Sequence, residues 1–339
     1  METISIDGGF GEGGGQILRT ALTLACISGR PLHIYNIRAA RPNPGLAKQH
    51  LSCVRAVSEI CSARCKGAEL GSQVLDFEPG QVHCGNYHFD IGSAGSATLV
   101  IQTVLPVLFL AKEPSKITVT GGTHNPWAPP FDFLKETFLP AIGSAGFQAD
   151  CRLLKHGFFP AGGGKIEFDI QPWNKKTDSS INLNRQDNER RVRGRIYTSK
   201  LPSHIANRQR KLLLESGLNI DEIEHIEITD SISAGNCVMI RLCGSKRITV
   251  FTAFGMRGRP SEKVVGEVVD MTQAFLTGAA AIDHFSADQL LIYMALSKSG
   301  CFTTNELSKH LTTNMEVIKK FLPVKFTAER EHSCFRVSC

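Results

Sequence analysis

Three stretches of this sequence share one pattern, in which a turn of small or polar residues leads into an apolar helix. They are GGQILRTALTLA, SATLVIQTVLPVL and ADQLLIYMAL, which begin at Gly14, Ser96 and Ala287. A repeated unit of this kind buries its apolar face by packing against the other units, so a repeat constrains the whole fold. The sequence therefore predicts an α/β (α+β) fold that contains three repeated units.

Strands and helices are expected in one order within these units. The first unit has predicted elements over 4–6, 16–27, 31–37, 46–63 and, as paired strands, around 68–77. The second has them over 87–91, 98–110, 116–120, 131–142, 147–154 and 164–170. The third has them over 290–297, 301–303, 315–321, 324–327 and 335–337. This shared order supports the repeat more strongly than the likeness between any two segments.

The segment 181–277 interrupts the repeat. It begins within a polar run over 174–191 that is typical of a linker. Its predicted strands and helices alternate over 193–197, 203–215, 224–228, 237–242, 248–254 and 262–276. This length and alternation predict a small inserted α/β domain. We therefore expect a large catalytic domain formed by 1–180 and 278–339, and an inserted domain over 181–277 that contains no candidate catalytic set.

Composition and charge narrow the class of protein. A chain of 339 residues is expected to form two or three domains, at about 150 residues each. Its net charge of +6 permits a nucleic-acid or phosphate partner without requiring one. The longest apolar run, 97–111, is interrupted by Gln102 and Pro106, and a bilayer span needs about 20 apolar residues. We expect no membrane partner and, because no basic region precedes an apolar core at the N-terminus, no signal peptide.

The cysteines are scattered rather than arranged as a framework. There are 11 of them, the closest pair is Cys61 and Cys65, and no CxxC motif occurs. This usage favours reduced thiols in a cytoplasmic protein over a disulfide scaffold. The missing ligand spacing also argues against a zinc site.

The stretch DGGFGEGGGQILR, residues 7–19, joins a short strand to a helix through a run of glycines. A glycine turn at a helix N-terminus presents free N–H groups that can bind an anion. Glu12 lies inside this turn and Arg19 follows one helical turn later. Because Mg²⁺ is often shared between carboxylates and substrate phosphates, Glu12 suggests a divalent cation. The alternative is a glycine-rich turn with no ligand.

A basic loop supplies further candidate phosphate ligands. Arg38, Arg41 and Lys48 are followed by Gln49 and His50, and the planar guanidinium group matches phosphate oxygens. The alternative is a solvated loop at the protein surface. Two other features suggest a nucleotide: Gln102 lies within an otherwise apolar helix, and Pro129, Pro130, Phe133 and Phe285 include residue types that can enclose a purine. These residues would also suit ordinary packing.

His310 is the candidate nucleophile. It precedes Leu311, Thr312, Thr313 and Asn314, which we interpret as the N-cap region of a helix. A histidine near a helix N-terminus is biased towards its neutral form, which is the nucleophilic one. As an isolated histidine it could equally have a structural role.

Seven segments together resemble the RNA 3′-terminal phosphate cyclase family, in the family's order and over nearly the whole chain. They are DGGFGEGGGQILRTAL, RAARPNPGLAKQHL, GSAGSATLVIQTVLP, GGTHNPWAPPFDF, HGFFPAGGGK, ADQLLIYMAL and HLTTNMEVIKKFLPVKF. The resemblance implies a large domain of three repeated βαβαββ-like units, similar to the enolpyruvyl transferase architecture, with a small inserted α/β domain.

The resemblance also implies an activity and a site. The family converts an RNA 3′-terminal phosphate to a 2′,3′-cyclic phosphodiester with ATP, through a histidyl–AMP intermediate and an adenylylated RNA end, and releases AMP and pyrophosphate. It therefore implies an enzyme of the nucleotidyl-transfer ligase type that binds RNA 3′-phosphate ends and ATP. By this resemblance His310 is the catalytic residue and Glu12 holds a divalent metal, Mg²⁺ or Mn²⁺. The implied nucleotide and phosphate contacts are Arg19, Arg38, Arg41, Gln49, Gln102, Pro129, Phe133, Phe285, Ser286, Asp288 and Gln289.

Two other functions remain open from the sequence. A non-catalytic nucleolar branch of the family acts in ribosome assembly as a binding protein, and it departs from the enzymes at the catalytic histidine. The sequence HLTTN, which begins at His310, favours the enzyme. An enolpyruvyl transferase is suggested by architecture alone, and fold does not imply function.

Overall fold

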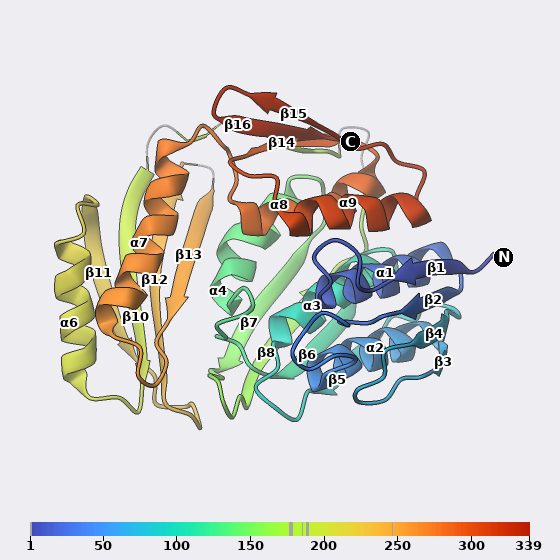
Figure 1. Cartoon of the computed structure of the whole chain (residues 1–339), viewed down its shortest axis with the longest axis horizontal. Coiled ribbons are helices and arrows are strands. Elements are labelled where there is room, and N and C mark those ends of the chain that lie inside the picture. The colour runs from blue at the N-terminus through green and yellow to red at the C-terminus, as the bar shows by residue number, and fades with distance from the viewer. Residues whose placement is uncertain (1, 176–178, 185, 188–189, 246) are drawn as a thin grey trace.

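The computed structural model describes residues 2–175, 179–184, 186–187, 190–245 and 247–339. Those residues form an α+β protein with four four-stranded sheets (Figure 1). Each sheet contains one parallel and two antiparallel strand pairs. The prediction of a mixed α+β fold is thus confirmed.

The first two sheets have the same strand order. The first unit consists of β1 (Ile4–Asp7), α1 (Gly15–Ser28), β2 (Leu32–Tyr35), α2 (Lys48–Cys61), β3 (Arg64–Lys66) and β4 (Leu75–Glu78). The second consists of β5 (Asn86–Asp90), α3 (Ala97–Phe109), β6 (Ser115–Gly121), α4 (Phe131–Phe133), η1 (Leu134–Phe138), α5 (Leu139–Gly143), β7 (Ala149–Lys155) and β8 (Gly164–Ile170). Their orders are β1-β2-β4-β3 and β5-β6-β8-β7. The parallel pair in each is joined through a helix, as parallel strands require a long crossover.

A third sheet repeats this order with a strand from the middle of the chain. Its elements are β9 (Ile181–Leu183), α8 (His284–Ser297), β14 (Gly300–Thr304), α9 (Lys309–Phe321), β15 (Thr327–Glu331) and β16 (Cys334–Ser338). The order is β9-β14-β16-β15, and β9 pairs with β14 in parallel. By hydrogen bonding, residues 181–183 therefore belong to this third sheet.

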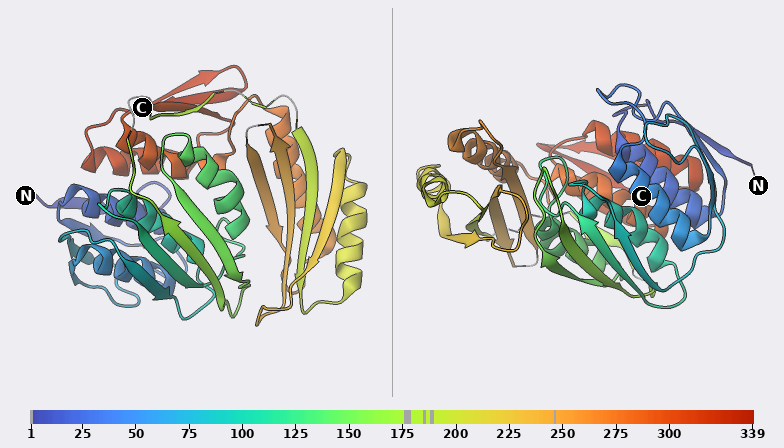
Figure 2. Two further views of the ribbon diagram at one scale, coloured as in Figure 1. Left: turned by 180° about the vertical axis from the view of Figure 1, so that it is seen from behind. Right: turned by 90° about the horizontal axis from the view of Figure 1, so that it is seen from below.

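The fourth sheet lies between β9 and α8 in the chain. It consists of β10 (Arg190–Ser199), α6 (Ser203–Leu214), β11 (Ile220–Glu227), β12 (Gly235–Gly244), β13 (Ile248–Phe254) and α7 (Ser261–Thr277). Its order, β11-β10-β12-β13, differs from that of the other sheets. Val238, Phe251 and Val268 are among the residues of a buried cluster between this sheet and its helices, distinct from the main core. Figure 2 shows this part beside the other three sheets.

Helices α1, α2, α3, α8 and α9 pack against one another among the first three sheets (Figures 1 and 2). In α3 every residue except Gln102 is buried, so this helix is apolar on all sides and Gln102 stands out as its one accessible polar group. No helix in the described part of the chain is long and apolar enough to cross a membrane. The eleven cysteines are free thiols.

Several predicted boundaries were wrong. The strand expected over 324–327 begins only at Thr327, and the first of the paired strands expected around 68–77 lies earlier, in β3. The helix expected over 131–142 contains the π-helical turn η1. Pro140, in α5, has no N–H group to donate, which interrupts the regular α-helical hydrogen bonds near this point. The predicted linker over 174–191 lies partly outside the described residues and contains β9.

Candidate active site

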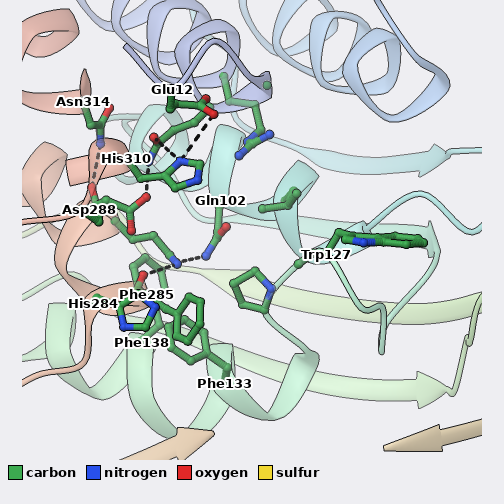
Figure 3. Close-up of a pocket in the computed structure, with 18 of the residues that line it drawn as sticks. Glu12, Gln102, Trp127, Phe133, Phe138, His284, Phe285, Asp288, His310 and Asn314 are labelled. Carbon is green, nitrogen blue, oxygen red and sulfur yellow. Dashed lines mark hydrogen bonds and ion pairs between the residues drawn. The ribbon is translucent and has the colours of Figure 1, made fainter. Parts of the chain in front are cut away.

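A cavity of about 1060 Å³ lies where the glycine turn, α1, α3, α8 and α9 meet (Figure 3). Most of the predicted site residues line it: Glu12, Arg19, Arg41, Gln49, Gln102, Pro129, Phe133, Phe285, Asp288, Gln289 and His310. Figure 3 shows a polar group around Glu12, His310 and Asp288, and an aromatic group around Phe133, Phe138 and Phe285. The fold thus brings together residues that are up to about 300 positions apart in the chain.

Arg38, Lys48 and Ser286 are predicted residues that do not line the cavity. The Arg38 guanidinium donates from Nη1 to the carbonyl of Gly45 over 2.7 Å. Ser286 is buried and its hydroxyl donates to Asp283 Oδ2 over 2.6 Å. Asp283 is the N-cap of α8, so this pair stabilises the start of that helix.

His310 is the second residue of α9, so the expectation that it precedes the helix was wrong. Ser308 is the N-cap, and its Oγ accepts from the backbone N–H of Leu311. The polar residues that suggested a later N-cap have partners elsewhere. Thr313 accepts from the Glu12 N–H, and Asn314 bonds both Thr20 and the Asp288 carbonyl.

The imidazole of His310 is oriented through one of its nitrogens. Nδ1 lies 3.1 Å from Gln16 Oε1 and 3.8 Å from Glu12 Oε2. Gln16 in turn donates from Nε2 to Asp288 Oδ2, which fixes its oxygen towards His310. With two acceptors facing it, Nδ1 carries the proton, and Nε2 keeps its lone pair. The His310 side chain is 55% exposed, so Nε2 is accessible to a ligand.

Gln16 was missed in the sequence analysis. It is buried at the start of α1, beside the glycine turn. The sequence did contain an indication of its role. Gln16 stands at the start of a mostly apolar helix, as Gln102 stands in the middle of one, and a buried amide needs hydrogen-bond partners. The sequence alone gives no reason to pair it with His310, which is 294 residues away.

Only one of the two oxygens of the Glu12 carboxylate has a hydrogen-bond partner among the described residues. Its side chain is 4% exposed, and Oε2 accepts from Arg41 Nη2 over 2.9 Å. Oε1 is buried and has no hydrogen-bond partner among the described residues. A carboxylate oxygen left without a partner fits a divalent cation. Since no group of three or more His, Cys, Asp or Glu in the described part of the chain could hold a metal ion, substrate oxygens would have to complete the ligand set.

The glycine turn allows this close packing. Gly11 has a φ of +59°, and a Cβ there would collide with Thr313. A Cβ at Gly14 would collide with the Glu12 carboxylate and with Arg41. Glycine at position 11 is therefore favoured by backbone conformation and by space, whereas a side chain at position 14 would displace the ends of Glu12 and Arg41.

A candidate anion site lies next to Glu12. The N-cap of α1 is Gly14, which has no side chain to accept from the first N–H groups of the helix. Arg19 lines the cavity one turn later, and no hydrogen bond or ion pair engages its guanidinium among the described residues. Burial lowers the pKa of Arg19, although an arginine remains charged at neutral pH. This combination suits a phosphate group.

Two buried groups near Arg19 have shifted pKa values. Burial, assisted by the charges of Arg19 and Arg38, lowers the pKa of His50 to about 3, so this imidazole is neutral. Burial raises the pKa of Asp288 to about 7, although the Arg19 charge opposes the shift. Asp288 therefore changes its charge near neutral pH while it holds Gln16.

Amides and rings line the other end of the cavity. Gln102 donates to Gln289 Oε1, and Gln289 donates to the Phe285 carbonyl over 2.6 Å. The loop that contains Pro129 is fixed by a 2.7 Å bond from Thr98 Oγ1 to the Pro129 carbonyl. Together with Phe133, these residues form an apolar slot with amide groups at its edge.

The segment between β9 and α8 supplies part of the cavity wall. Val250, Thr252 and Phe254 of β13, with Glu267 and Met271 of α7, line it. The sequence analysis found no catalytic set in this segment and did not anticipate that it borders the site. Its lining residues are mainly apolar, and Glu267 is paired with Arg259.

An accessible imidazole nitrogen, guanidinium groups and a buried carboxylate in one cavity are typical of enzymes that transfer phosphate-containing groups. The chain is more closely defined by its sequence relatives. It belongs to the RNA 3′-terminal phosphate cyclase family, whose model matches residues 10–328. The family resemblance carried by the seven sequence segments is thus confirmed.

Three relatives named RNA 3′-terminal phosphate cyclase align over almost their whole length. The relative from Pseudomonas fluorescens is 41% identical over 329 residues, which cover 97% of this chain and 95% of the relative. The relative from Ralstonia nicotianae is 43% identical over 336 residues, covering 98% and 96%. The relative from Koribacter versatilis is 44% identical over 344 residues, covering 100% and 95%.

Proposed function

We propose that this protein converts the 3′-terminal phosphate of an RNA to a 2′,3′-cyclic phosphodiester with consumption of ATP, and that His310 is its covalent nucleophile. The observation that carries this proposal is the imidazole of His310: its Nδ1 faces Gln16 and Glu12, while its Nε2 is accessible. Membership of the cyclase family supports the overall reaction.

In the first step Nε2 of His310 attacks the α-phosphorus of ATP. The bond between this phosphorus and the oxygen bridging to the β-phosphate breaks, and pyrophosphate leaves with the electron pair. The imidazole gains positive character, which the nearby Glu12 carboxylate and the Gln16 oxygen stabilise. Glu12 Oε1 would hold Mg²⁺ or Mn²⁺, which supplies charge neutralisation at the phosphates.

In the second step an oxygen of the RNA 3′-phosphate attacks the same phosphorus, and the bond to Nε2 breaks. The RNA end now carries AMP in a phosphoanhydride. The neighbouring 2′-hydroxyl then attacks the former 3′-phosphate, its proton is lost to solvent, and AMP leaves. Splitting one difficult displacement into three easier ones is the general advantage of covalent catalysis.

The remaining site residues are proposed to bind the nucleotide. Arg19, Arg41 and Gln49 would contact phosphates beside the N-terminus of α1. Pro129, Phe133 and Phe285 would enclose the adenine, while Gln102, Asp288 and Gln289 would supply polar contacts. For Arg38 and Ser286 we propose supporting roles, since their side chains bond to Gly45 and Asp283.

We also propose that the three sheets of equal strand order form one large domain with repeated βαβαββ-like units, as in enolpyruvyl transferases. The inserted domain would then extend from β10 to α7, with β9 in the large domain. The separate buried cluster between the fourth sheet and its helices supports this division.

The decisive experiment locates the AMP. The protein is incubated with ATP labelled in the α-phosphate, and the adduct is mapped by mass spectrometry. His310→Ala should abolish the adduct and the cyclisation of an RNA 3′-phosphate, retain ATP binding, and still cyclise a pre-adenylylated RNA. His332→Ala, in the turn between β15 and β16, is the matched control. An adduct on another residue, or normal adenylation by His310→Ala, would overturn the proposal.

A further inference from the structure

Two large aromatic side chains to which the proposed reaction assigns no role are exposed next to each other. Trp127, in the loop between β6 and α4, is 69% exposed, and Phe159, in the loop between β7 and β8, is 47% exposed. Their ring centroids are 5.4 Å apart and their planes meet at 86°. Single exposed apolar residues are common, but an adjacent pair of exposed rings marks a candidate binding surface.

This pair is continuous with the cavity that contains His310. Trp127 lines that cavity, and Figure 3 shows it apart from the polar group around Glu12 and His310. Clefts for a drug-sized ligand measure about 300–1,000 Å³. At about 1060 Å³ the cavity exceeds that range and has room beyond a single nucleotide.

The proposed reaction requires a second ligand in this same cavity. The RNA 3′-phosphate has to reach the phosphorus that is bound to His310, so the terminal nucleotide of the RNA must lie nearby. The slot of Pro129, Phe133 and Phe285 is already assigned to the adenine of ATP. An unpaired terminal base has two free π-faces, and proteins commonly bind such bases by stacking them on aromatic side chains.

We propose that Trp127 and Phe159 form a stacking platform for the 3′-terminal base of the RNA, distinct from the adenine slot; this inference rests on the proposed function. The platform offers ring surface and a single indole N–H, so it accepts any of the four bases. It positions the RNA end for attack and takes no part in the transfer of AMP to His310.

The two tryptophans of the chain make the platform directly observable. Trp173 stacks on Phe147 with centroids 4.4 Å apart, and its indole donates to the Ala145 carbonyl. Trp173→Phe preserves a stacked ring and leaves Trp127 as the sole indole. A five-nucleotide single-stranded RNA with a 3′-phosphate should quench its fluorescence. The same RNA with an abasic terminal nucleotide should bind at least about fivefold more weakly.

Kinetics provide the second measurement, in a chain that retains Trp173. Trp127→Ala and Phe159→Ala should each raise the KM for the RNA end at least about fivefold, while the rate of protein–AMP formation from ATP stays within twofold of wild type. Trp127→Phe should restore most of the loss, because a ring is regained. Leu214→Ala, which removes an exposed apolar side chain from α6, is the control.

The outcomes separate this inference from the proposed function. Normal KM values for RNA in Trp127→Ala, or equal binding of the abasic RNA, overturn the platform while protein–AMP formation is intact. Strong quenching of Trp127 by ATP alone would place the adenine there and also overturn it. If the wild-type protein forms no AMP adduct but Trp127 in the Trp173→Phe variant is quenched by the RNA, the proposed function fails and the platform stands.

Discussion

We expect Gln16 to act on the proposed reaction through another residue, His310. Its oxygen faces Nδ1 of His310, and its NH₂ group is held by Asp288. If this contact fixes the tautomer, Gln16→Met should slow protein–AMP formation about 10- to 100-fold, since a hydrogen bond to a charged group contributes about 1.5–3 kcal/mol. ATP affinity should change less than twofold, because Gln16 forms hydrogen bonds to His310 and Asp288 and has no charge that could attract the phosphates.

Single-turnover adenylation and ATP titration measure these two quantities. Gln273→Met, on the exposed face of α7, is the matched control for loss of an amide. An unaltered rate in Gln16→Met would contradict the positioning role.

Glu12 is the residue whose metal role can be tested most directly. Oε1 is buried without a partner among the described residues, which supports the proposal that it binds a divalent cation. Glu12→Gln keeps the size of the side chain and removes its charge. We expect it to raise the Mg²⁺ or Mn²⁺ concentration for half-maximal adenylation at least about tenfold, as loss of a charged ligand would.

The comparison variant for Glu12 is Glu267→Gln, which changes the carboxylate of the cavity wall that pairs with Arg259. It should leave the metal titration unchanged. Equal metal dependence in wild type and Glu12→Gln would rule out Glu12 as a ligand. Direct binding of Mn²⁺ in the presence of ATP, followed by electron paramagnetic resonance, gives a readout besides activity.

At the scale of elements, the start of α9 determines where His310 points. The Ser308 side chain caps the helix by accepting from the Leu311 N–H over 3.1 Å. Ser308→Ala should lower the free energy of unfolding by about 1 kcal/mol. Because His310 is two residues from the cap, fraying of this turn should also slow adenylation. Ser308→Asp should restore stability, and denaturant unfolding of both variants tests this; equal midpoints for Ser308→Ala and wild type would contradict it.

The same helix illustrates what the sequence can and cannot predict. Thr312, Thr313 and Asn314 have side chains that favour caps as well as turns, so local pattern placed the helix start near them. Thr312 donates locally to the Ser308 and Lys309 carbonyls. The partners of Thr313 and Asn314 are Glu12, Thr20 and Asp288, which come from distant parts of the chain. Contacts of that kind override local preference.

Elements with strong internal patterns were predicted well. Strand β6 alternates buried and half-buried residues along its whole length, and α3 is apolar on all sides. Strand β9 shows the opposite case. It has only three residues within a polar run, and it is a strand because it pairs with β14, 119 residues later. The candidate site divides in the same way. The family segments identified Glu12 and His310 from the sequence. Gln16 and the β13 residues of the cavity wall could be assigned to the site only from the structure.

At the scale of the whole molecule, a buried polar network joins the fourth sheet to the second unit. Asp132 of α4 is 6% exposed and accepts from His124, Tyr197 and Arg195 over 2.9, 2.9 and 3.2 Å. Tyr197 and Arg195 belong to β10, so this carboxylate connects the two parts. The network fixes the sheet that carries the cavity wall of β13, and its loss should therefore affect both stability and the site.

Asp132 gives the last prediction, which concerns pH. Burial alone would raise the pKa of Asp132, but the hydrogen bonds from His124 and Tyr197 and the charge of Arg195 lower it to about 2. A carboxyl whose pKa is lower in the folded state stabilises the fold fully above its unfolded pKa of about 3.9. That contribution is lost as the pH falls from about 4 towards 2. The free energy of unfolding of wild type should therefore fall more steeply over this window than that of Asp132→Asn.

Urea unfolding at a series of pH values measures this difference. At pH 7 Asp132→Asn should be less stable by about 2–3 kcal/mol, which is the free energy of lowering the pKa of Asp132 from about 3.9 to about 2 at about 1.4 kcal/mol per unit. The exposed pair of Arg208 and Glu262 is the control, and Glu262→Gln should leave the stability almost unchanged. Parallel stability curves for wild type and Asp132→Asn between pH 4 and 2 would show that Asp132 is not the group responsible. Convergence of the two curves at the acid end is expected, since the protonated carboxyl and the amide are both neutral there.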